Sequence, residues 1–92
     1  MLEKKIEQKL RKEVVKLGGL CEKWTSGTSG WPDRIVLLPE GKLAFVETKA
    51  PGKKPRALQE HRHQQLRKLG YKVFTIDGED EIGEIINEIR TT

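Results

Sequence analysis

Cysteine is almost absent from this sequence of 92 residues, which contains Cys21 alone. A lone cysteine excludes an internal disulfide and any zinc site built from several cysteines, so stability has to come from the hydrophobic core and from self-association. Long apolar runs are also absent, because the longest, 35–38 and 43–46, have four residues, whereas a membrane-spanning helix needs about 20. The first residues mix acids and bases and lack the apolar stretch of about 7 to 15 residues of a secretory signal. We therefore expect an intracellular, cytoplasmic protein without a membrane partner.

Charge is abundant, and it is unevenly distributed along the chain. Lysine and arginine outnumber acids by six to three in residues 1–16 and by seven to one in residues 49–68, which gives +3 and +6. Residues 77–90 hold six acids and one arginine, which gives −5. A basic middle next to an acidic end predicts one face that meets polyanions and another that does not, although a merely solvated surface shows the same pattern.

Apolar periodicity and turn residues predict seven elements in one domain over 1–92, since the chain is slightly shorter than the about 100 to 150 residues of a typical domain. In order, these are a helix over 2–17, strands over 20–25, 34–38 and 43–48, a helix over 55–69, a strand over 71–76, and a last helix capped by Asp77 or Asp80. The second and third strands form a hairpin with apolar residues on both faces, which is typical of central strands covered by helices. The predicted fold class is α/β, in the α+β sense.

The two later helices differ in their apolar faces. The last one carries isoleucines at the i, i+3, i+4, i+7 spacing of a helix that packs on a sheet. They are Ile82, Ile85, Ile86 and Ile89. The helix over 55–69 has only Leu58, Leu66 and Leu69 on its apolar stripe. We expect it to cover its face of the sheet poorly, so that apolar surface is shared between subunits.

One charged motif is distinguished by its position. Glu-x-Lys occurs four times, so the pattern alone carries no information, but Glu47-Thr48-Lys49 follows the continuous apolar run of 43–46. Side chains two apart on a strand point to the same face, about 7 Å from each other, where this buried strand emerges. Asp33 opens the partner strand, and the hairpin brings it opposite this motif. The alternative is a frayed strand end in solvent.

These residue types suit metal-assisted hydrolysis of a phosphodiester bond. Two carboxylates, Asp33 and Glu47, can hold Mg²⁺, which keeps several waters and usually takes one or two protein carboxylates. Lys49 beside them can orient or help deprotonate a water, and it can offset negative charge that builds on a phosphate.

The same residues carry a resemblance to a known family. Gly30-Trp31-Pro32-Asp33 and then Glu47-Thr48-Lys49, on an α-β-β-β-α-β order, resemble the PD-(D/E)XK nuclease superfamily, whose restriction-endonuclease-like core is a mixed sheet flanked by helices. The Gly18-Gly19 helix end, the loop before Asp33 and Gln59 are similar to the VRR-NUC branch. The resemblance implies that Asp33 and Glu47 bind the metal and that Lys49 is the catalytic lysine. It also implies that Gln59 and a first-helix glutamate complete the site.

Two glutamates of the first helix, Glu3 and Glu7, are candidates for that position. At 100° per residue, Glu3 lies about 40° from the centre of the apolar stripe and Glu7 about 80° from it. A carboxylate inside the stripe faces the sheet, where burial is costly without a partner or a metal, so we favour Glu3. Glu13 lies equally close to the centre, and helix geometry alone therefore does not decide.

Other chemistry-bearing residues fit no separate site. His61 and His63 lie two apart on a helix and point to different sides, which excludes the i, i+4 pair of a zinc site, and we expect His63 to be solvated. The glycines of 26–30 match no nucleotide-binding loop. Core packing is favoured for Trp24, whereas Trp31 either packs or stacks on an exposed base.

The sequence therefore predicts a Mg²⁺- or Mn²⁺-dependent DNA endonuclease of the VRR-NUC type. Glu3, Asp33 and Glu47 would bind the metal, Lys49 would position the attacking water, and Gln59 would steady that water or the lysine. Similarity to Holliday-junction resolvases implies branched DNA such as a four-way junction, with flaps or nicked duplex DNA as alternatives, cut by a homodimer or a dimer of dimers. Basic side chains of the middle segment are expected to hold the phosphate backbone: Lys53, Lys54, Arg56, Arg62, Arg67 and Lys68.

Two other function classes stay open at this point. A non-catalytic nucleic-acid-binding module of the same fold would bind without metal, and its binding would survive loss of Asp33. A small interaction protein would use the isoleucine face of the last helix, and it would associate with a partner without any effect of nucleic acid.

Overall fold

A computed structural model describes residues 2–91 and contains the seven expected elements in the predicted order. They are α1 (Leu2–Lys16), β1 (Leu20–Lys23), β2 (Arg34–Leu38), β3 (Lys42–Thr48), α2 (Ala57–Lys68), β4 (Lys72–Ile76) and α3 (Ile82–Arg90), with one 3₁₀ turn, η1 (Glu79–Glu81), before α3. No helix within the described residues is apolar and long enough to span a bilayer.

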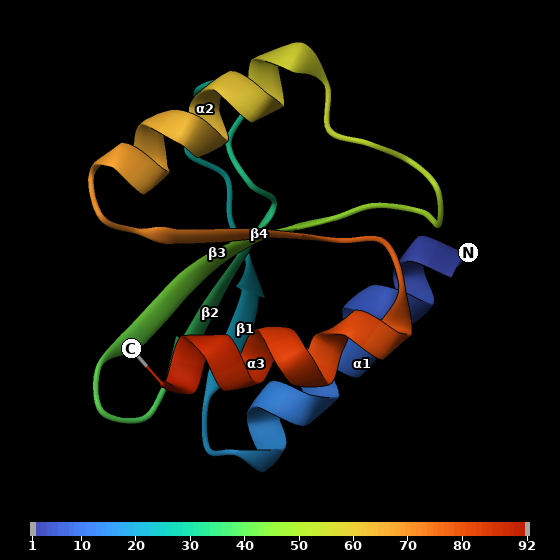
Figure 1. The fold of residues 1–92 in the computed structure, drawn as a ribbon. Coiled ribbons are helices and arrows are strands. Elements are labelled where there is room, and N and C mark those ends of the chain that lie inside the picture. The colour runs from blue at the N-terminus through green and yellow to red at the C-terminus, as the bar shows by residue number, and fades with distance from the viewer. Residues whose placement is uncertain (1, 92) are drawn as a thin grey trace.

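The four strands form one mixed sheet in the order β1-β2-β3-β4. β1 pairs antiparallel with β2, and β2 pairs antiparallel with β3 as the predicted hairpin. β4 lies parallel to β3, because α2 carries the chain back between them. α1 and α3 cover one face of the sheet and α2 lies over the other (Figure 1). The predicted α/β fold, a mixed sheet flanked by helices, is confirmed.

The hydrophobic core lies mainly between the sheet and the helices α1 and α3. Its buried cluster includes Ile6, Leu10 and Val14 of α1 and all four isoleucines of the α3 stripe. On the α2 face, the buried cluster consists of Phe45, Leu66 and Val73. The two faces of the hairpin are thus unequally covered, as the weak amphipathicity of the second helix predicts.

The face that α2 turns to the sheet differs from the predicted one. Leu58 and Leu69 are 49% and 73% exposed, whereas His63, expected in solvent, is fully buried at 0%. Gln59, His63 and Leu66 follow the i, i+4, i+7 spacing and therefore share one face of α2. Leu58 lies one residue, about 100°, away from that face, and Leu69 follows the end of the helix. The prediction from the leucine stripe was wrong, because Gln59 and His63 lie on the side of α2 that contacts the sheet.

The start of α3 also differs from the prediction. Neither Asp77 nor Asp80 caps the helix, since the 3₁₀ turn of Glu79–Glu81 precedes it. The Glu81 carboxylate instead reaches back and accepts a hydrogen bond from the Asp77 backbone N–H at 3.0 Å. That contact holds the connection between β4 and α3.

β1 is shorter than predicted, and its end leaves Trp24 outside the core. The backbone N–H of Trp24 donates to the Asp33 carbonyl at 2.9 Å, but the side chain is 38% exposed, so core packing was wrong for this residue. Its ring lies 6.5 Å from that of Trp31, which packs against the small cluster on the α2 face. The position of β1 at the sheet edge, away from α2, explains the exposure.

The turn between α1 and β1 depends on two glycines. Gly18 adopts φ +86°, a left-handed conformation that glycine adopts without strain. A Cβ on Gly19 would lie 2.3 Å from the Leu37 carbonyl oxygen and 2.9 Å from the Leu38 side chain. The absence of a side chain at Gly19 therefore lets the end of α1 approach β2 closely.

Candidate active site

Asp33 and the end of β3 meet as the hairpin geometry predicts. Arg34 pairs with Val46, so Asp33 lies beside the last residues of β3. One carboxylate oxygen of Asp33 accepts the Thr48 backbone N–H at 3.1 Å, and the other accepts from Thr48 Oγ1 at 3.0 Å. Two hydrogen bonds from one residue fix the plane of this carboxylate at the end of the sheet.

The end of β3 places functional side chains on both faces of the sheet. Thr48 points to α1, because its hydroxyl lies 3.1 Å from Glu7 Oε1. Glu47 points to α2, because its Oε2 accepts from Gln59 Nε2 at 3.3 Å. Lys49 lies on the same side as Glu47, with Nζ 3.6 Å from Oε2. The alternation of side chains along a strand accounts for this division.

An acidic cluster forms where α1 meets Asp33. Glu3, Glu7 and Asp33 each offer one carboxylate oxygen, and these oxygens all lie within 4.8 Å of one another. Arg34, which is buried, donates to Glu7 Oε2 at 2.6 Å. Glu7 is therefore engaged on both oxygens, by Arg34 and by Thr48, although sequence reasoning favoured Glu3 over it. The buried Arg34 and the face of Thr48 are the features that sequence reasoning missed, and strand alternation could have indicated Thr48.

The donor set of this cluster fits a divalent cation. The Thr48 hydroxyl lies within hydrogen-bond distance of both Glu7 and Asp33, but it has one proton to donate. Burial raises the pKa of Asp33, the hydrogen bonds from Thr48 lower it, and the negative charge of Glu7 raises it further. Converging carboxylate oxygens with too few donors favour a hard cation such as Mg²⁺ or Mn²⁺.

Glu47 is the most perturbed acid of the site. Its exposure is 4%, and burial raises its pKa to about 7, with a further increase from the charge of Asp33 and a decrease from Lys49. Oε2 has two partners, Gln59 and Lys49, whereas the buried Oε1 accepts no hydrogen bond from the described residues. A buried oxygen without a donor is again consistent with a metal ligand.

Comparisons with known proteins agree with this geometry. The profile of the VRR-NUC domain matches residues 1–80. A protein with the printed name "Putative nuclease p44", from Acyrthosiphon pisum secondary endosymbiont phage 1, is 48% identical over 79 residues, which is 85% of either chain. The chain belongs to the VRR-NUC nuclease family. A solved structure described as a VRR_NUC domain superposes on this family member with a TM-score of 0.87 at 32% identity, over 95% of this chain and 96% of that one.

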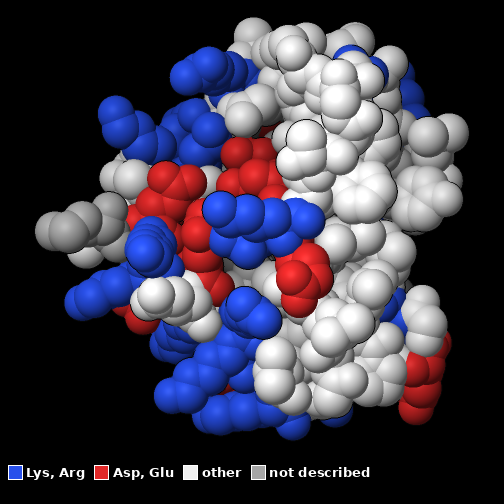
Figure 2. All heavy atoms as spheres, turned by 180° about the vertical axis from the view of Figure 1, so that it is seen from behind, with Lys and Arg blue, Asp and Glu red and all other residues white. Residues whose placement is uncertain are grey.

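Positive charge lies close to acidic side chains on one face of this VRR-NUC chain. Figure 2 shows acidic side chains grouped on one face, with lysine and arginine side chains on several sides of them. Lys53, Lys54 and Arg56 are exposed on the connection that leaves β3 directly after Lys49. Lys4 and Lys23, which sequence reasoning did not select, line a hollow of about 440 Å³ next to Glu7 and Arg34.

Two of the remaining predicted phosphate contacts, Arg62 and Arg67, have partners within the chain. Arg62 donates to Gln65 Oε1 at 2.7 Å, and Arg67 donates to the Val73 carbonyl at 2.9 Å. Arg67 and Lys68 lie in the last turn of α2, about 12 Å or more along the helix axis from Gln59. Of the predicted phosphate contacts, those on the connection before α2 therefore follow Glu47 and Lys49 most closely along the chain.

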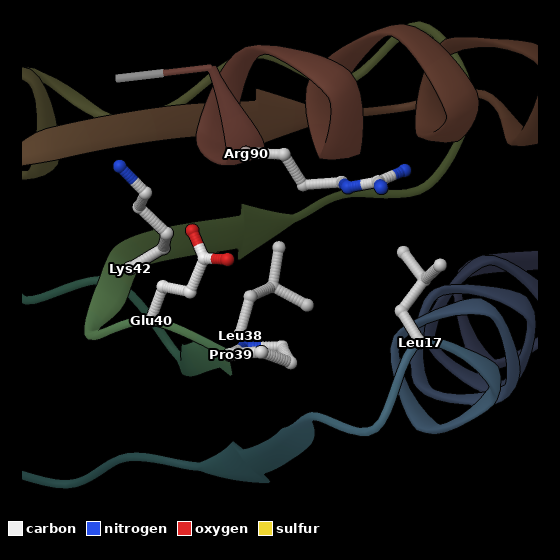
Figure 3. A pocket seen from close by; sticks show the side chains of 6 residues that line it. All are labelled: Leu17, Leu38, Pro39, Glu40, Lys42 and Arg90. Atoms are coloured by element: carbon white, nitrogen blue, oxygen red, sulfur yellow. The ribbon is translucent and has the colours of Figure 1, made fainter.

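A separate hollow of about 180 Å³ lies at the other end of the hairpin (Figure 3). Its lining comes from the ends of α1 and α3 and from the turn between β2 and β3. The residues are Leu17, Leu38, Pro39, Glu40, Lys42 and Arg90. β2 and β3 separate it from Asp33 and Glu47, so this hollow does not belong to the acidic site.

Proposed function

We propose that this VRR-NUC protein is a metal-dependent DNA endonuclease that hydrolyses phosphodiester bonds. The proposal is supported by one observation, the acidic cluster of Glu3, Glu7 and Asp33 where the hairpin ends, with Glu47 and Lys49 at the adjacent end of β3. Besides burial, the negative charge of Asp33 and, to a smaller extent, that of Glu3 raise the pKa of Glu47, which supports a shared role of the three acids. Such a set of acids, with a lysine at its edge, contains the groups that hydrolysis of a phosphodiester requires.

Glu3, Asp33 and Glu47 would hold Mg²⁺ or Mn²⁺. When bound, such an ion polarises a phosphoryl oxygen and lowers the pKa of a water. Lys49, with its side chain 19% exposed, can orient a water on the DNA side and offset negative charge on the phosphate. Gln59 is fixed because its Oε1 accepts the Arg56 N–H at 2.8 Å, and its amide nitrogen then holds Glu47.

DNA would bind over the exposed surface around the acidic cluster. Phosphates need positive charge but no reading of bases, which matches lysines and arginines on several sides of the site. The phosphate contacts that we propose are Lys53, Lys54, Arg56, Arg62, Arg67 and Lys68. The first three lie on the connection before α2, which follows Lys49 directly. An open surface suits a polymer substrate better than an enclosed pocket does.

The substrate we propose is branched DNA such as a four-way junction, cut by a homodimer or a dimer of dimers. The α2 side of the sheet leaves apolar side chains in solvent, including Leu20 at 57%, Leu37 at 36% and Tyr71 at 50%. A second copy of the chain would cover this face, and a twofold assembly would present two active sites to a symmetric junction.

Cleavage assays test this function directly. Labelled four-way junction, duplex and single-stranded DNA are incubated with the protein, with Mg²⁺ or with EDTA. We expect junction cleavage that needs the metal. Asp33→Asn and Lys49→Ala should abolish cleavage but leave DNA binding largely intact, because they remove chemistry and not phosphate-binding charge. Cleavage by either variant close to the wild-type rate would contradict the assignment, and metal-independent binding without cleavage would favour the non-catalytic module.

A further inference from the structure

His63 is a buried polar side chain that the proposed chemistry does not use. It lies on α2 with 0% exposure, and neither ring nitrogen has a hydrogen-bond partner among the described residues. A buried polar group without a partner destabilises the folded state, because it has lost its hydrogen bonds to water. An imidazole placed facing the sheet at this cost, where a leucine would pack better, requires a specific reason.

The partner that faces His63 is Glu47. Its Nε2 lies 3.9 Å from Glu47 Oε1, which is itself buried and without a donor. Gln59, one helical turn earlier on the same face of α2, donates to the other oxygen, Oε2, at 3.3 Å. α2 therefore presents one side chain to each oxygen of this carboxylate. Gln59 Nε2 lies within hydrogen-bond distance of Oε2, whereas the distance between His63 Nε2 and Oε1 is about 1 Å longer than a typical hydrogen bond.

We propose that His63 is a positioning residue whose Nε2–H donates to Glu47 Oε1 and fixes the orientation in which Glu47 meets the divalent cation. The inference rests on the proposed function. Ligating carboxylates are themselves usually hydrogen-bonded, and such contacts often close only when the site is loaded.

Two carboxylates face the His63 ring, one at each nitrogen. Glu60 lies 3.8 Å from Nδ1, but its side chain is 53% exposed and can turn into solvent. The Glu47 side chain is only 5% exposed and cannot turn into solvent in the same way. The N–H therefore belongs on Nε2, toward Glu47.

Metal affinity tests this role without any cleavage assay. His63→Leu removes both nitrogens at similar volume, whereas His63→Gln keeps an N–H near the position of Nε2. Mn²⁺ binding is followed by the electron paramagnetic resonance signal of the free ion. We expect His63→Leu to weaken Mn²⁺ binding by about 10- to 100-fold and His63→Gln to restore it to within about threefold of wild type. Wild-type affinity in His63→Leu, or equal weakening in both variants, would overturn the proposal.

Two controls complete the test. Glu60→Gln changes the carboxylate on the other side of the ring, and it should leave Mn²⁺ affinity unchanged, because Glu60 lies in solvent. A large loss of Mn²⁺ affinity in this variant would contradict the proposal, because the important contact of His63 would then be the one with Glu60. The ¹⁵N spectrum of wild-type His63, recorded with Mg²⁺, needs no variant to fold and should show the proton on Nε2. A proton on Nδ1 alone would also overturn the inference.

The failure of this inference can be separated from failure of the proposed function. Asp33→Asn is measured in the same Mn²⁺ titration. If the wild-type protein and Asp33→Asn bind Mn²⁺ equally, the metal site itself is wrong. If Asp33→Asn loses the metal and His63→Leu keeps it, the metal site stands and the role of His63 falls.

Discussion

Glu47 combines deep burial with a negative charge, so folding is coupled to pH at this residue. Its pKa is about 7 in the folded chain, compared with 4.5 for an ordinary glutamate. Above pH 7 the folded protein holds a buried carboxylate, whereas the unfolded chain places the same charge in water. Glu47 therefore lowers the free energy of unfolding at high pH, and this penalty disappears as the pH falls from 7 toward 4.5.

Glu47→Gln should reverse this effect in metal-free protein. We expect the free energy of unfolding to rise by about 3 kcal/mol at pH 8 and to be unchanged near pH 4.5, because the amide has the shape of the acid and no charge. Urea denaturation in EDTA at a series of pH values measures the difference. Glu88→Gln, on the exposed side of α3, is the matched control and should show no such pH dependence. A gain that is the same at both pH values would contradict the raised pKa.

The turn that joins α1 to β1 determines how closely the first helix, and with it the two glutamates, lies against the sheet. Gly19→Ala places a Cβ at 2.3 Å from the Leu37 carbonyl oxygen, so backbone must move. We expect a loss of about 2 kcal/mol or more in the free energy of unfolding, and weaker metal binding as α1 shifts. Gly83→Ala in α3 meets nothing within 4 Å and should instead stabilise the protein by up to about 1 kcal/mol. Thermal melting of both variants measures these changes. A Gly19→Ala variant as stable as the wild type would contradict the close approach of α1 to β2.

The connection before α2 carries the basic residues that lie next to the acidic cluster. Neutralising Lys53, Lys54 and Arg56 together should weaken binding to every DNA shape alike, and it should lower the salt slope by about one for each lost phosphate contact. Fluorescence anisotropy at a series of salt concentrations measures both quantities.

A charge-matched control separates this effect from net charge. Lys12, Lys16 and Arg90 are exposed, and Lys16 and Arg90 end their helices, α1 and α3, away from Asp33. Their combined neutralisation should change the salt slope much less. An unchanged slope in the Lys53, Lys54 and Arg56 variant would move the DNA path to another surface, such as the hollow beside Lys4 and Lys23.

The folded chain leaves part of the apolar surface of its sheet exposed to solvent. A chain of this length typically buries about 60 to 65% of the surface of its unfolded form, and α2 leaves part of its face open. We expect a mass of at least twice 10.5 kDa in light scattering at micromolar concentration. Leu37→Asp on the open face should produce monomers, whereas Val15→Asp, at a 53% exposed position on α1, should not. A wild-type monomer with full cleavage activity would contradict the dimer.

The sequence alone was sufficient for the local part of this protein. The element order follows from apolar periodicity, and the approach of Asp33 to the Glu47-Thr48-Lys49 motif follows from the length of one hairpin. These are relations between near neighbours, for which strand alternation and the turn leave little freedom. The candidate site could be proposed from the sequence because Asp33, Glu47 and Lys49 lie on or next to that hairpin.

The tertiary structure decided what lies between elements that are distant in sequence. Arg34 and Thr48 hold Glu7 beside Asp33, and a helical wheel of α1 contains no information about either partner. His63 is buried because α2 packs over the face of the sheet to which Glu47 points. The leucines of α2 had predicted that another side of the helix contacts the sheet. Trp24 is exposed because β1 is the sheet edge. Burial and pairing of polar groups depend on which surfaces meet, and that is a property of the packed molecule and not of any segment.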